Sequence, residues 1–317
     1  MRSPKTAAAV FVAGAALVLG GGLGTAAASS PDAEGLGPAA VGVCSSTAVS
    51  GQSVRGALSQ AEVHRLLSPL ASQHRSQYGI PDKGPLGTGV GSAAVQPLVS
   101  IHPAQGTAFK SASGSDGSCA TQSVSTQLTV RNSATTIYTP TMYPPGGSCV
   151  ELVTVYTATV RSVSAWDWCR SVNFAASVPI NSSFLSTYTN GSGAYTGRVV
   201  KTSTSGNTWT AALYNYAAGR WDTLFTQSGT NQSGRTDGWD IEELYSSVGT
   251  SGRAYSCDDM AGLTFESSNI AVRKNGTWST ATSANSDTHY DQPNSAFYCP
   301  TRSYQMISTY DHWKAVG

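Results

Sequence analysis

Charge is scarce in this chain: Asp, Glu, Lys and Arg make up 12% of its 317 residues. The 19 Lys and Arg residues are nearly balanced by 18 Asp and Glu residues, which leaves a formal net charge of +1. A nucleic-acid-binding surface needs a strong positive excess, because it must neutralise phosphates. The sequence therefore predicts no nucleic-acid partner.

Long apolar runs are scarce as well. The most apolar stretch, Ala7 to Leu19, is shorter than the roughly 18 residues that a membrane-spanning helix needs. Arg2 and Lys5 precede it, and Ala26-Ala27-Ala28 follows it as an A-x-A cleavage site. This order is typical of a secretory signal peptide. We therefore expect a cleaved signal peptide at residues 1–28, an extracellular protein and no membrane insertion.

The six cysteines include no C-x-x-C pair, which argues against a zinc or redox site. An even number of cysteines in an exported chain indicates disulfides. Proximity in sequence favours two bridges within strand-rich segments and leaves a third to hold the N-terminal region: Cys149–Cys169, Cys257–Cys299 and Cys44–Cys119.

Residues 29–117 contain no tryptophan and are rich in Ser, Ala, Gly and Pro. One part has a helical pattern: Ser59 and Glu62 form a capping box, and apolar residues follow at helical spacing. Pro69 would end this helix, but Ser68-Pro69 also suits the start of a second one. We expect one or two helices in this segment, which is an appendage docked on the rest of the chain, a linker or a propeptide.

The region after residue 117 has a different character. All seven tryptophans lie there, among short β-rich runs separated by Gly, Asn, Ser and Pro. Val124 to Val130 alternates as a half-buried strand does, and Leu152 to Val160 is apolar on both faces, as in a central strand. Pro144-Pro145-Gly146-Gly147 predicts a turn.

Two hairpins are also predicted in this region. The first joins Trp209–Tyr216 to Trp221–Phe225, with Gly219 supplying a positive φ in the loop. The second turns at Asn275-Gly276, a strong type I′ signal. Strands at this spacing predict an all-β fold, an antiparallel two-sheet β-sandwich of jelly-roll type at residues 118–317, preceded by a short helical N-terminal appendage.

Acidic residues gather in one stretch, Asp237 to Tyr245, whose nine residues hold four carboxylates. In a strand, Trp239 and Glu243 would share one face, while Asp240 and Glu242 would share the other. A carboxylate and an aromatic ring that face the same cleft can bind or cut a polar polymer. The same charges would also suit an edge strand that resists aggregation.

A second candidate surface lies in the first predicted hairpin. One face of its first strand carries Trp209 and Leu213 and is expected to be buried, while the other carries small residues framed by Tyr214 and Tyr216. Together with Trp221, this second face would suit the stacking of sugar rings. Ordinary core and rim packing of the same aromatics is the alternative.

Other chemical patterns are weaker. Cys257-Asp258-Asp259 offers oxygens to calcium, but no D-x-D-x-D-G spacing supports a metal site, and none is predicted. His289 and His312 lie in the expected sandwich, but a Ser-His-Asp triad would need a G-x-S-x-G elbow that the chain lacks. No cofactor is implied. A glycosidase needs two carboxyls on either side of the sugar, and Glu243 with Asp222 or Asp258 could provide them, although many such pairs can be drawn.

From roughly Cys149 to Gly317 the chain resembles a known family. The runs VPINSSFLSTY, NTWTAALYNYAAGRWDTLF and GWDIEELY, in this order, are similar to the glutamic peptidases (eqolisins) and to the concanavalin-like lectin sandwiches whose fold they share. Trp239 to Glu243 is the most specific part and looks like the family's W-I-x-E-[DE] strand. The resemblance implies two bent antiparallel sheets with a concave face and, in the peptidases, a Gln/Glu dyad on that face.

The chain departs from the family at the catalytic position. The family's catalytic glutamate directly precedes the tryptophan, where this chain has Gly238, and Asp237 would point to the opposite face. No clear counterpart of the glutamine-bearing strand is found. We therefore expect a secreted, non-catalytic module for an extracellular polysaccharide or protein polymer, with these candidate contacts: Glu243, Trp239, Asp237, Tyr214, Tyr216 and Trp221. The alternative is a secreted hydrolase that uses carboxylates, either a glutamic-type peptidase or a glycan-cleaving enzyme.

Overall fold

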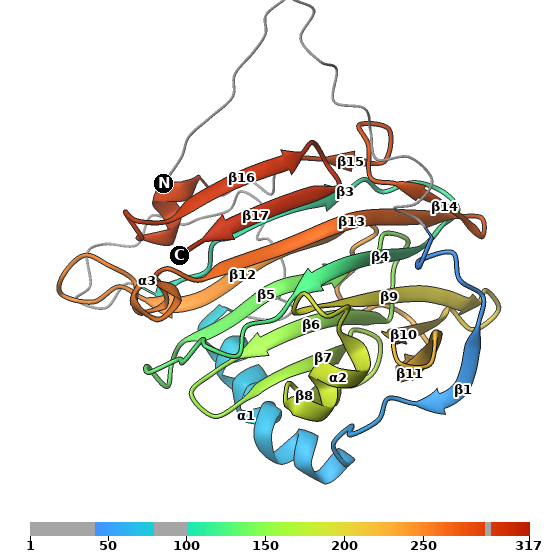
Figure 1. Cartoon of the computed structure of the whole chain (residues 1–317), viewed down its shortest axis with the longest axis horizontal. Helices are drawn as coiled ribbons and strands as arrows, with labels where there is room; N and C mark the ends of the chain where they lie inside the picture. The colour runs from blue at the N-terminus through green and yellow to red at the C-terminus, as the bar shows by residue number, and fades with distance from the viewer. Residues whose placement is uncertain (1–41, 79–99, 289–292) are drawn as a thin grey trace, which may run out of the picture. The chain divides into compact units, whose positions relative to one another are not determined.

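The computed structural model describes residues 42–78, 100–288 and 293–317 (Figure 1). The predicted signal peptide and His289 lie outside these residues. All described residues belong to one compact unit, Pro38–Gly317. Within the described ranges this unit consists mainly of two β-sheets, and the predicted all-β sandwich is confirmed.

The nine-stranded sheet runs in the order β1-β11-β10-β9-β4-β13-β17-β16, and β14 pairs with β13. Its pairs are antiparallel except for β1 with β11. The strands are β1 Val49–Ser53, β4 Ser115–Ser123, β9 Ala194–Ser203, β10 Thr208–Asn215, β11 Arg220–Gln227, β13 Thr264–Lys274, β14 Thr277–Thr280, β16 Ser303–Ser308 and β17 His312–Val316.

The eight-stranded sheet is antiparallel and runs in the order β15-β3-β12-β5-β6-β7-β8, with β2 paired to β12. Strands β2 and β3 lie before residue 118 and β4 spans it, so the sheets take residues from both sides of the predicted domain boundary. The strands are β2 Ser100–Ile101, β3 Ala104–Phe109, β5 Thr136–Tyr143, β6 Val150–Tyr156, β7 Arg161–Asp167, β8 Asn173–Pro179, β12 Gly238–Ser247 and β15 Ser286–Asp287.

The faces that the two sheets turn toward each other supply the main core. Trp209 and Leu213 of β10 belong to this core, and so do Leu152 of β6 and Leu244 of β12. Ala212 and Tyr214 lie in a different apolar cluster, which confirms the predicted division of β10 into two faces. The alternation of side chains along each strand therefore determines which residues are available for a site.

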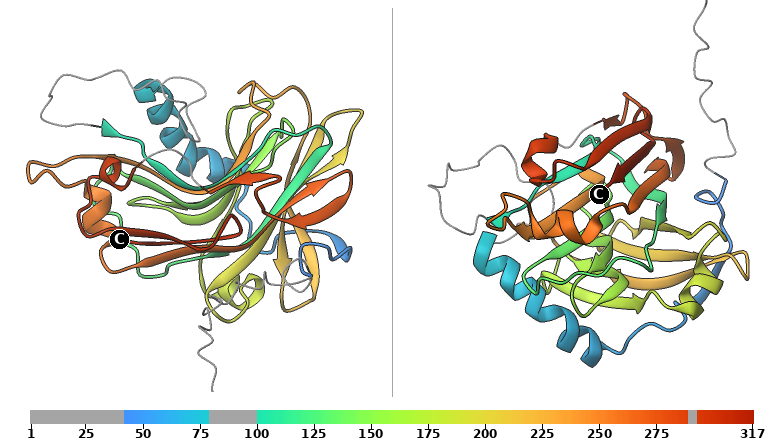
Figure 2. Two further views of the ribbon diagram at one scale, coloured as in Figure 1. Left: turned by 90° about the horizontal axis from the view of Figure 1, so that it is seen from above. Right: turned by 60° about the vertical axis from the view of Figure 1, so that its left-hand side comes forward.

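One helix packs on the opposite face of the eight-stranded sheet. Helix α1, Gln60–Tyr78, begins after the predicted capping box, in which the Ser59 N–H donates to a Glu62 carboxylate oxygen at 2.9 Å. It lies along β8 (Figures 1 and 2) and buries Val63, Leu67 and Ala71 there.

The prediction that Pro69 ends the first helix is wrong, because α1 continues through it. Pro69 is on the exposed side, so water can satisfy the Arg65 carbonyl that loses its helical partner. Two short helices went unpredicted, α2 at Ser182–Tyr188 and α3 at Tyr255–Met260, together with a 3₁₀ turn at Asn294–Phe297.

The predicted strand at Val124 to Val130 is absent from the structure. The Ser125 hydroxyl accepts the Leu128 N–H at 3.0 Å, and the Tyr156 hydroxyl accepts the Ser125 N–H at 2.8 Å. These side-chain contacts replace the backbone hydrogen bonds that a strand would need. The observed strand in this region is β4, which ends at Ser123, just before the predicted one.

The second predicted strand is too long by its last four residues. β6 ends at Tyr156, and the Thr157 N–H then donates to the Val160 carbonyl at 2.8 Å, which closes a tight turn. The two hairpins are confirmed, with φ of 64° at Gly219, 48° at Asn275 and 79° at Gly276.

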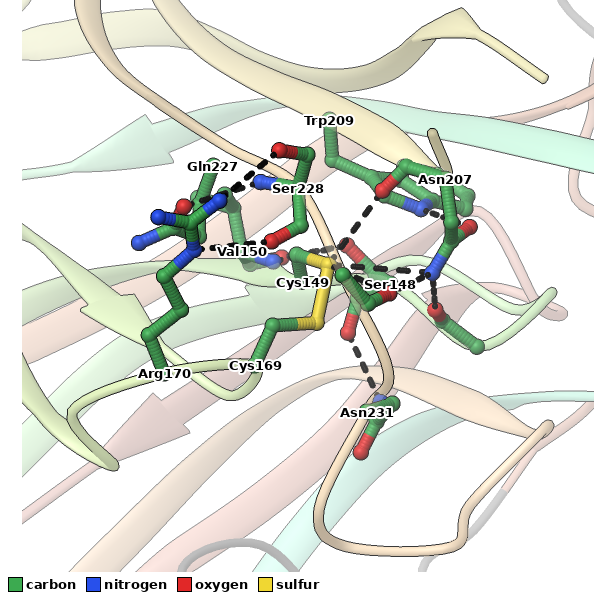
Figure 3. The surroundings of a disulfide bond; sticks show 12 residues. Ser148, Cys149, Val150, Cys169, Arg170, Asn207, Trp209, Gln227, Ser228 and Asn231 are labelled. Atoms are coloured by element: carbon green, nitrogen blue, oxygen red, sulfur yellow. Dashed lines mark hydrogen bonds between the residues drawn. A yellow bond between two sulfur atoms is a disulfide. The ribbon is translucent and has the colours of Figure 1, made fainter. Parts of the chain in front are cut away.

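All three predicted disulfides are present: Cys44–Cys119, Cys149–Cys169 and Cys257–Cys299. Figure 3 shows the second, which joins the start of β6 to the loop after β7. Beside it, the Asn207 amide donates to the Gly229 carbonyl at 2.9 Å and accepts the Trp209 indole N–H at 2.8 Å (Figure 3). Closing a loop of this length stabilises the fold by roughly 3 kcal/mol in the chain-entropy model.

Candidate functional site

Strand β12 lies inside the eight-stranded sheet, between β3 and β5, and carries acidic residues on both faces. Trp239, Ile241 and Tyr245 belong to the apolar cluster on the side of α1, while Leu244 belongs to the core between the sheets. The predicted alternation is thus confirmed, and Glu243 lies on the side of Trp239. We call this side the glutamate face.

Glu243 is held by two aromatic side chains on the glutamate face. Its Oε1 atom lies 2.6 Å from Nε2 of His102 and accepts the Tyr245 hydroxyl at 2.7 Å. The His102 ring stacks on Tyr245 at a centroid distance of 3.8 Å, and Tyr138 meets Tyr245 edge-on. These contacts fix the orientation of the Glu243 carboxylate, which is fully buried.

A second buried carboxylate, Glu151 of β6, lies on the same face. It accepts the Thr141 hydroxyl at 2.5 Å and the indole N–H groups of Trp168 at 3.1 Å and Trp239 at 3.3 Å. Burial raises the pKa of Tyr138 well above its usual range, and the charges of Glu243 and Glu151 raise it further. Both carboxylates thus act on one tyrosine.

Burial of two glutamates on one face is costly for folding. A buried ionised group carries a desolvation penalty of several kcal/mol, and apolar residues of similar size often replace buried ions without loss of stability. Buried ionisable groups with charged neighbours occur at functional sites and also in structural networks. Aliphatic and aromatic side chains share this face, and the aromatic ones include Tyr138, Tyr143, Trp166, Trp168, Phe174, Trp239 and Tyr245.

The other acidic residues of β12 face the interior of the sandwich. Asp240 accepts hydrogen bonds from the Gln122 amide at 2.8 Å and from the Trp313 indole at 2.9 Å. Burial raises the pKa of Asp240 to about 7, against the opposing effect of these hydrogen bonds. Glu242 forms an ion pair with Arg302 at 2.5 Å, and both side chains are buried. Neither carboxylate faces a surface that could receive a ligand.

The position before Trp239 cannot hold a side chain. A Cβ atom on Gly238 would overlap the carbonyl oxygen of Tyr143 and would lie 2.7 Å from the backbone of Pro144 and Pro145. Asp237, just outside the strand, instead pairs with Arg235 at 2.6 Å, and the Arg235 guanidinium lies 5.0 Å from the Trp239 ring centroid.

The remaining predicted contacts lie on the nine-stranded sheet. Trp221 is buried beside Tyr214, and its indole donates to the Ser46 carbonyl at 3.1 Å. The Tyr216 hydroxyl is 2.6 Å from that of Thr196. The structure therefore brings Glu243 and Trp239 together on one sheet and places Tyr214, Tyr216 and Trp221 on the other.

Sequence reasoning missed His102 and Glu151. His102 falls in the segment that was assigned to the appendage, and its position next to β12 depends on the pairing of β2 and β3 with that strand. Glu151 carried a usable signal, because it is the single acid in a run whose residues are buried on both faces.

No metal site or membrane span emerges from the described part of the chain. It contains no group of three or more His, Cys, Asp and Glu residues that could hold a metal ion. Asp258 instead pairs with Arg253 at 3.0 Å, and His312 pairs with Glu266 at 2.5 Å. No helix among these residues is long and apolar enough to cross a membrane.

Comparison with known proteins identified structural neighbours only. No family model matches the chain, and no curated protein matches it. Similar solved structures are scytalido-glutamic peptidase with a peptide-based transition state analog (14% identity, TM-score 0.40) and with a transition state analog inhibitor (13%, 0.40). A third is SCP-B, a member of the Eqolisin family of peptidases, in a complex with the tripeptide Ala-Ile-His (12%, 0.39). Each alignment covers 69% of this chain and 98% of the other.

Proposed function

We propose that the protein is an exported binding module whose glutamate face takes an extracellular polysaccharide. The observation that carries the proposal is the placement of Glu151 and Glu243 on one face among aromatic rings. Carboxylates accept hydrogen bonds from sugar hydroxyls, and aromatic rings stack on the apolar faces of sugars. This combination suits a neutral, hydroxyl-rich polymer.

Binding without cleavage is supported by the surroundings of Gly238. In the peptidases that the sequence resembles, the catalytic glutamate precedes the tryptophan of this strand. Here the backbone of Tyr143 and Pro144 occupies the space that such a side chain would need.

A ligand can reach the glutamate face only if its present cover moves, because Glu151 and Glu243 have no exposed surface. Helix α1 packs on the same cluster through Val63, Leu67 and Ala71. The contacts of α1 are mainly with β8, at the far end of the sheet from β12.

Export is supported by the three disulfides, because such bonds persist in oxidising compartments outside the cytosol. The predicted signal peptide at residues 1–28 would direct the chain there.

The proposal is tested by retention of the mature protein on cellulose, chitin, xylan and peptidoglycan. Glu243→Gln should weaken binding to the retained polymer roughly tenfold to a hundredfold, the value of one hydrogen bond to a charged group. Glu266→Gln, on the surface beside His312, is the matched control and should bind normally. Retention on none of the four polymers would contradict the proposal.

One observation favours a hydrolase as the second candidate. The imidazole of His102 and the carboxylate of Glu243 are 2.6 Å apart, as in a general base oriented by an acid. Release of peptides from acid-denatured protein, or of reducing sugars from the retained polymer, would establish this activity if both His102→Ala and Glu243→Gln abolished it.

A further inference from the structure

A cavity of about 360 Å³ lies where loops of both sheets converge, away from the side chains of the glutamate face. Its volume is at the lower end of the range for small-molecule sites, roughly 300–1,000 Å³. The lining comes from the β3–β4 loop, the β5–β6 turn, the end of β9, the segment before β12 and the β13–β14 turn: residues 111–116, Gly146, Lys201, Thr204, Thr236 and Asn275.

Hydroxyl groups dominate this lining. The Ser111 hydroxyl donates to that of Thr236 at 2.8 Å. Ser113 and Thr204 are exposed, and their hydroxyls make no hydrogen bond to other described residues. Such groups can both donate to and accept from the hydroxyls of a sugar ring.

The cavity is lined by one basic and one acidic side chain, Lys201 and Asp116. Its acidic residue, Asp116, is already engaged, because it pairs with Arg273 at 3.6 Å and accepts the Gly276 N–H at 2.9 Å. Among the described residues, no carboxylate lies within ion-pair distance of Lys201. The Lys201 ammonium is 4.9 Å from the Trp209 ring centroid, which restrains the long side chain.

Two glycines fix the shape of the cavity wall. Gly114 and Gly146 have φ of 83° and 105°, a region that other residues rarely adopt. A Cβ on Gly114 would overlap the Asn275 side chain, and one on Gly146 would overlap the Ser115 carbonyl. The wall is therefore backbone in close contact, and the cavity exists before any ligand arrives.

We propose that this cavity binds one acidic sugar unit, with its carboxylate against Lys201 and its ring hydroxyls against Ser113, Thr204 and Asn275. With Asp116 paired to Arg273, Lys201 is the cation left for a ligand, and one cation among hydroxyls in a space of this volume suits a monosaccharide that bears one negative charge. This site is independent of the function proposed for the glutamate face.

The test titrates the disulfide-bonded mature protein with glucuronic acid, glucose and inorganic phosphate, using calorimetry or protein NMR. Glucuronic acid should bind about tenfold more tightly than glucose, the effect of one charge-assisted hydrogen bond. Lys201→Gln should remove this preference, Lys201→Arg should keep most of it, and Lys314→Gln is the control for a lysine elsewhere. The double variant Ser113→Ala/Thr204→Val should lower the affinity for glucuronic acid and for glucose by the same factor.

Equal affinity for glucuronic acid and glucose in the wild-type protein would overturn the role of Lys201, and so would an unchanged preference in Lys201→Gln. Phosphate that binds as tightly as glucuronic acid would show that the cavity is a simple anion site and would overturn the proposal that its ligand is a sugar. Binding of none of the three would overturn the site itself. Glu243→Gln should leave these titrations unchanged, which separates this outcome from the fate of the proposed function.

Discussion

The two faces of the eight-stranded sheet hold the carboxylates of β12 and β6 in different ways. On the inner face, Glu242 pairs with the guanidinium of Arg302, and Asp240 sits in a hydrogen-bond network between the sheets. On the outer face, Glu151 accepts bonds from a hydroxyl and two indoles, and Glu243 contacts His102 and a phenol. The comparison separates acids that join the two sheets from acids held beside aromatic rings on the glutamate face.

The largest effect is expected from breaking the inner ion pair. Arg302→Met leaves Glu242 as an uncompensated buried charge and should lower the free energy of unfolding by about 3–5 kcal/mol. Urea denaturation of the purified variant measures it. Adding Glu242→Leu removes the unpaired charge and should recover most of the lost stability. A double variant as unstable as Arg302→Met alone would show that the unpaired charge of Glu242 is not the cause of the loss.

The pH dependence of stability should reveal Asp240. Because burial raises its pKa from 3.8 to about 7, the folded protein keeps this proton at pH values where the unfolded chain has lost it. The stabilisation from this group is therefore full below about pH 4 and is lost as the pH rises towards 7, at up to about 1.4 kcal/mol per pH unit. Thermal melts of wild type and Asp240→Asn from pH 4 to 8 test this, and parallel curves would contradict it.

Gly238→Ala tests the close packing before Trp239. The added methyl group meets the backbone of Tyr143 and Pro144, so a loss of about 1–3 kcal/mol is expected. Gly147→Ala, in the turn that follows these residues, is the control. A methyl group added at Gly147 has space around it, although the backbone of Gly147 has a positive φ. A fully stable Gly238→Ala would show that an acidic side chain could be accommodated there after all.

The smallest effect is expected on the outer face. Tyr245→Phe removes one hydrogen bond to Glu243 while keeping the ring that stacks on His102, and should cost about 1–2 kcal/mol. Chemical denaturation measures the loss. A cost as large as that of Arg302→Met would mean that the outer face is as structural as the inner one.

Much of the fold could be predicted from the sequence because the patterns that indicate its hairpins and strands are local. The hairpin at Asn275-Gly276 needs only two residues with positive φ, and the alternation of Trp239 to Glu243 needs only a strand. Strand β4 was missed because its residues, SDGSCATQS, are small and polar, and they are strand-like only between β9 and β13.

Only part of the candidate site could be predicted, because some of its contacts join residues that are far apart in the sequence. Glu243 could be found from the acids around it, whereas its partner His102 is 141 residues away in sequence. Likewise, Glu151 meets Trp239 only because β5 pairs with both β6 and β12. Contacts of this kind depend on strand order, which a single sequence does not determine.

The contrast between Glu243→Gln and Glu242→Gln tests the central claim most directly, because the two residues are adjacent and differ in the face they occupy. Affinity for the retained polysaccharide and melting temperature are measured on both variants. We expect Glu243→Gln to lose roughly tenfold or more in affinity with a nearly unchanged melting temperature, and Glu242→Gln to melt lower while its folded fraction binds as wild type. Normal binding by Glu243→Gln, or an equal loss of affinity in both variants, would contradict the account.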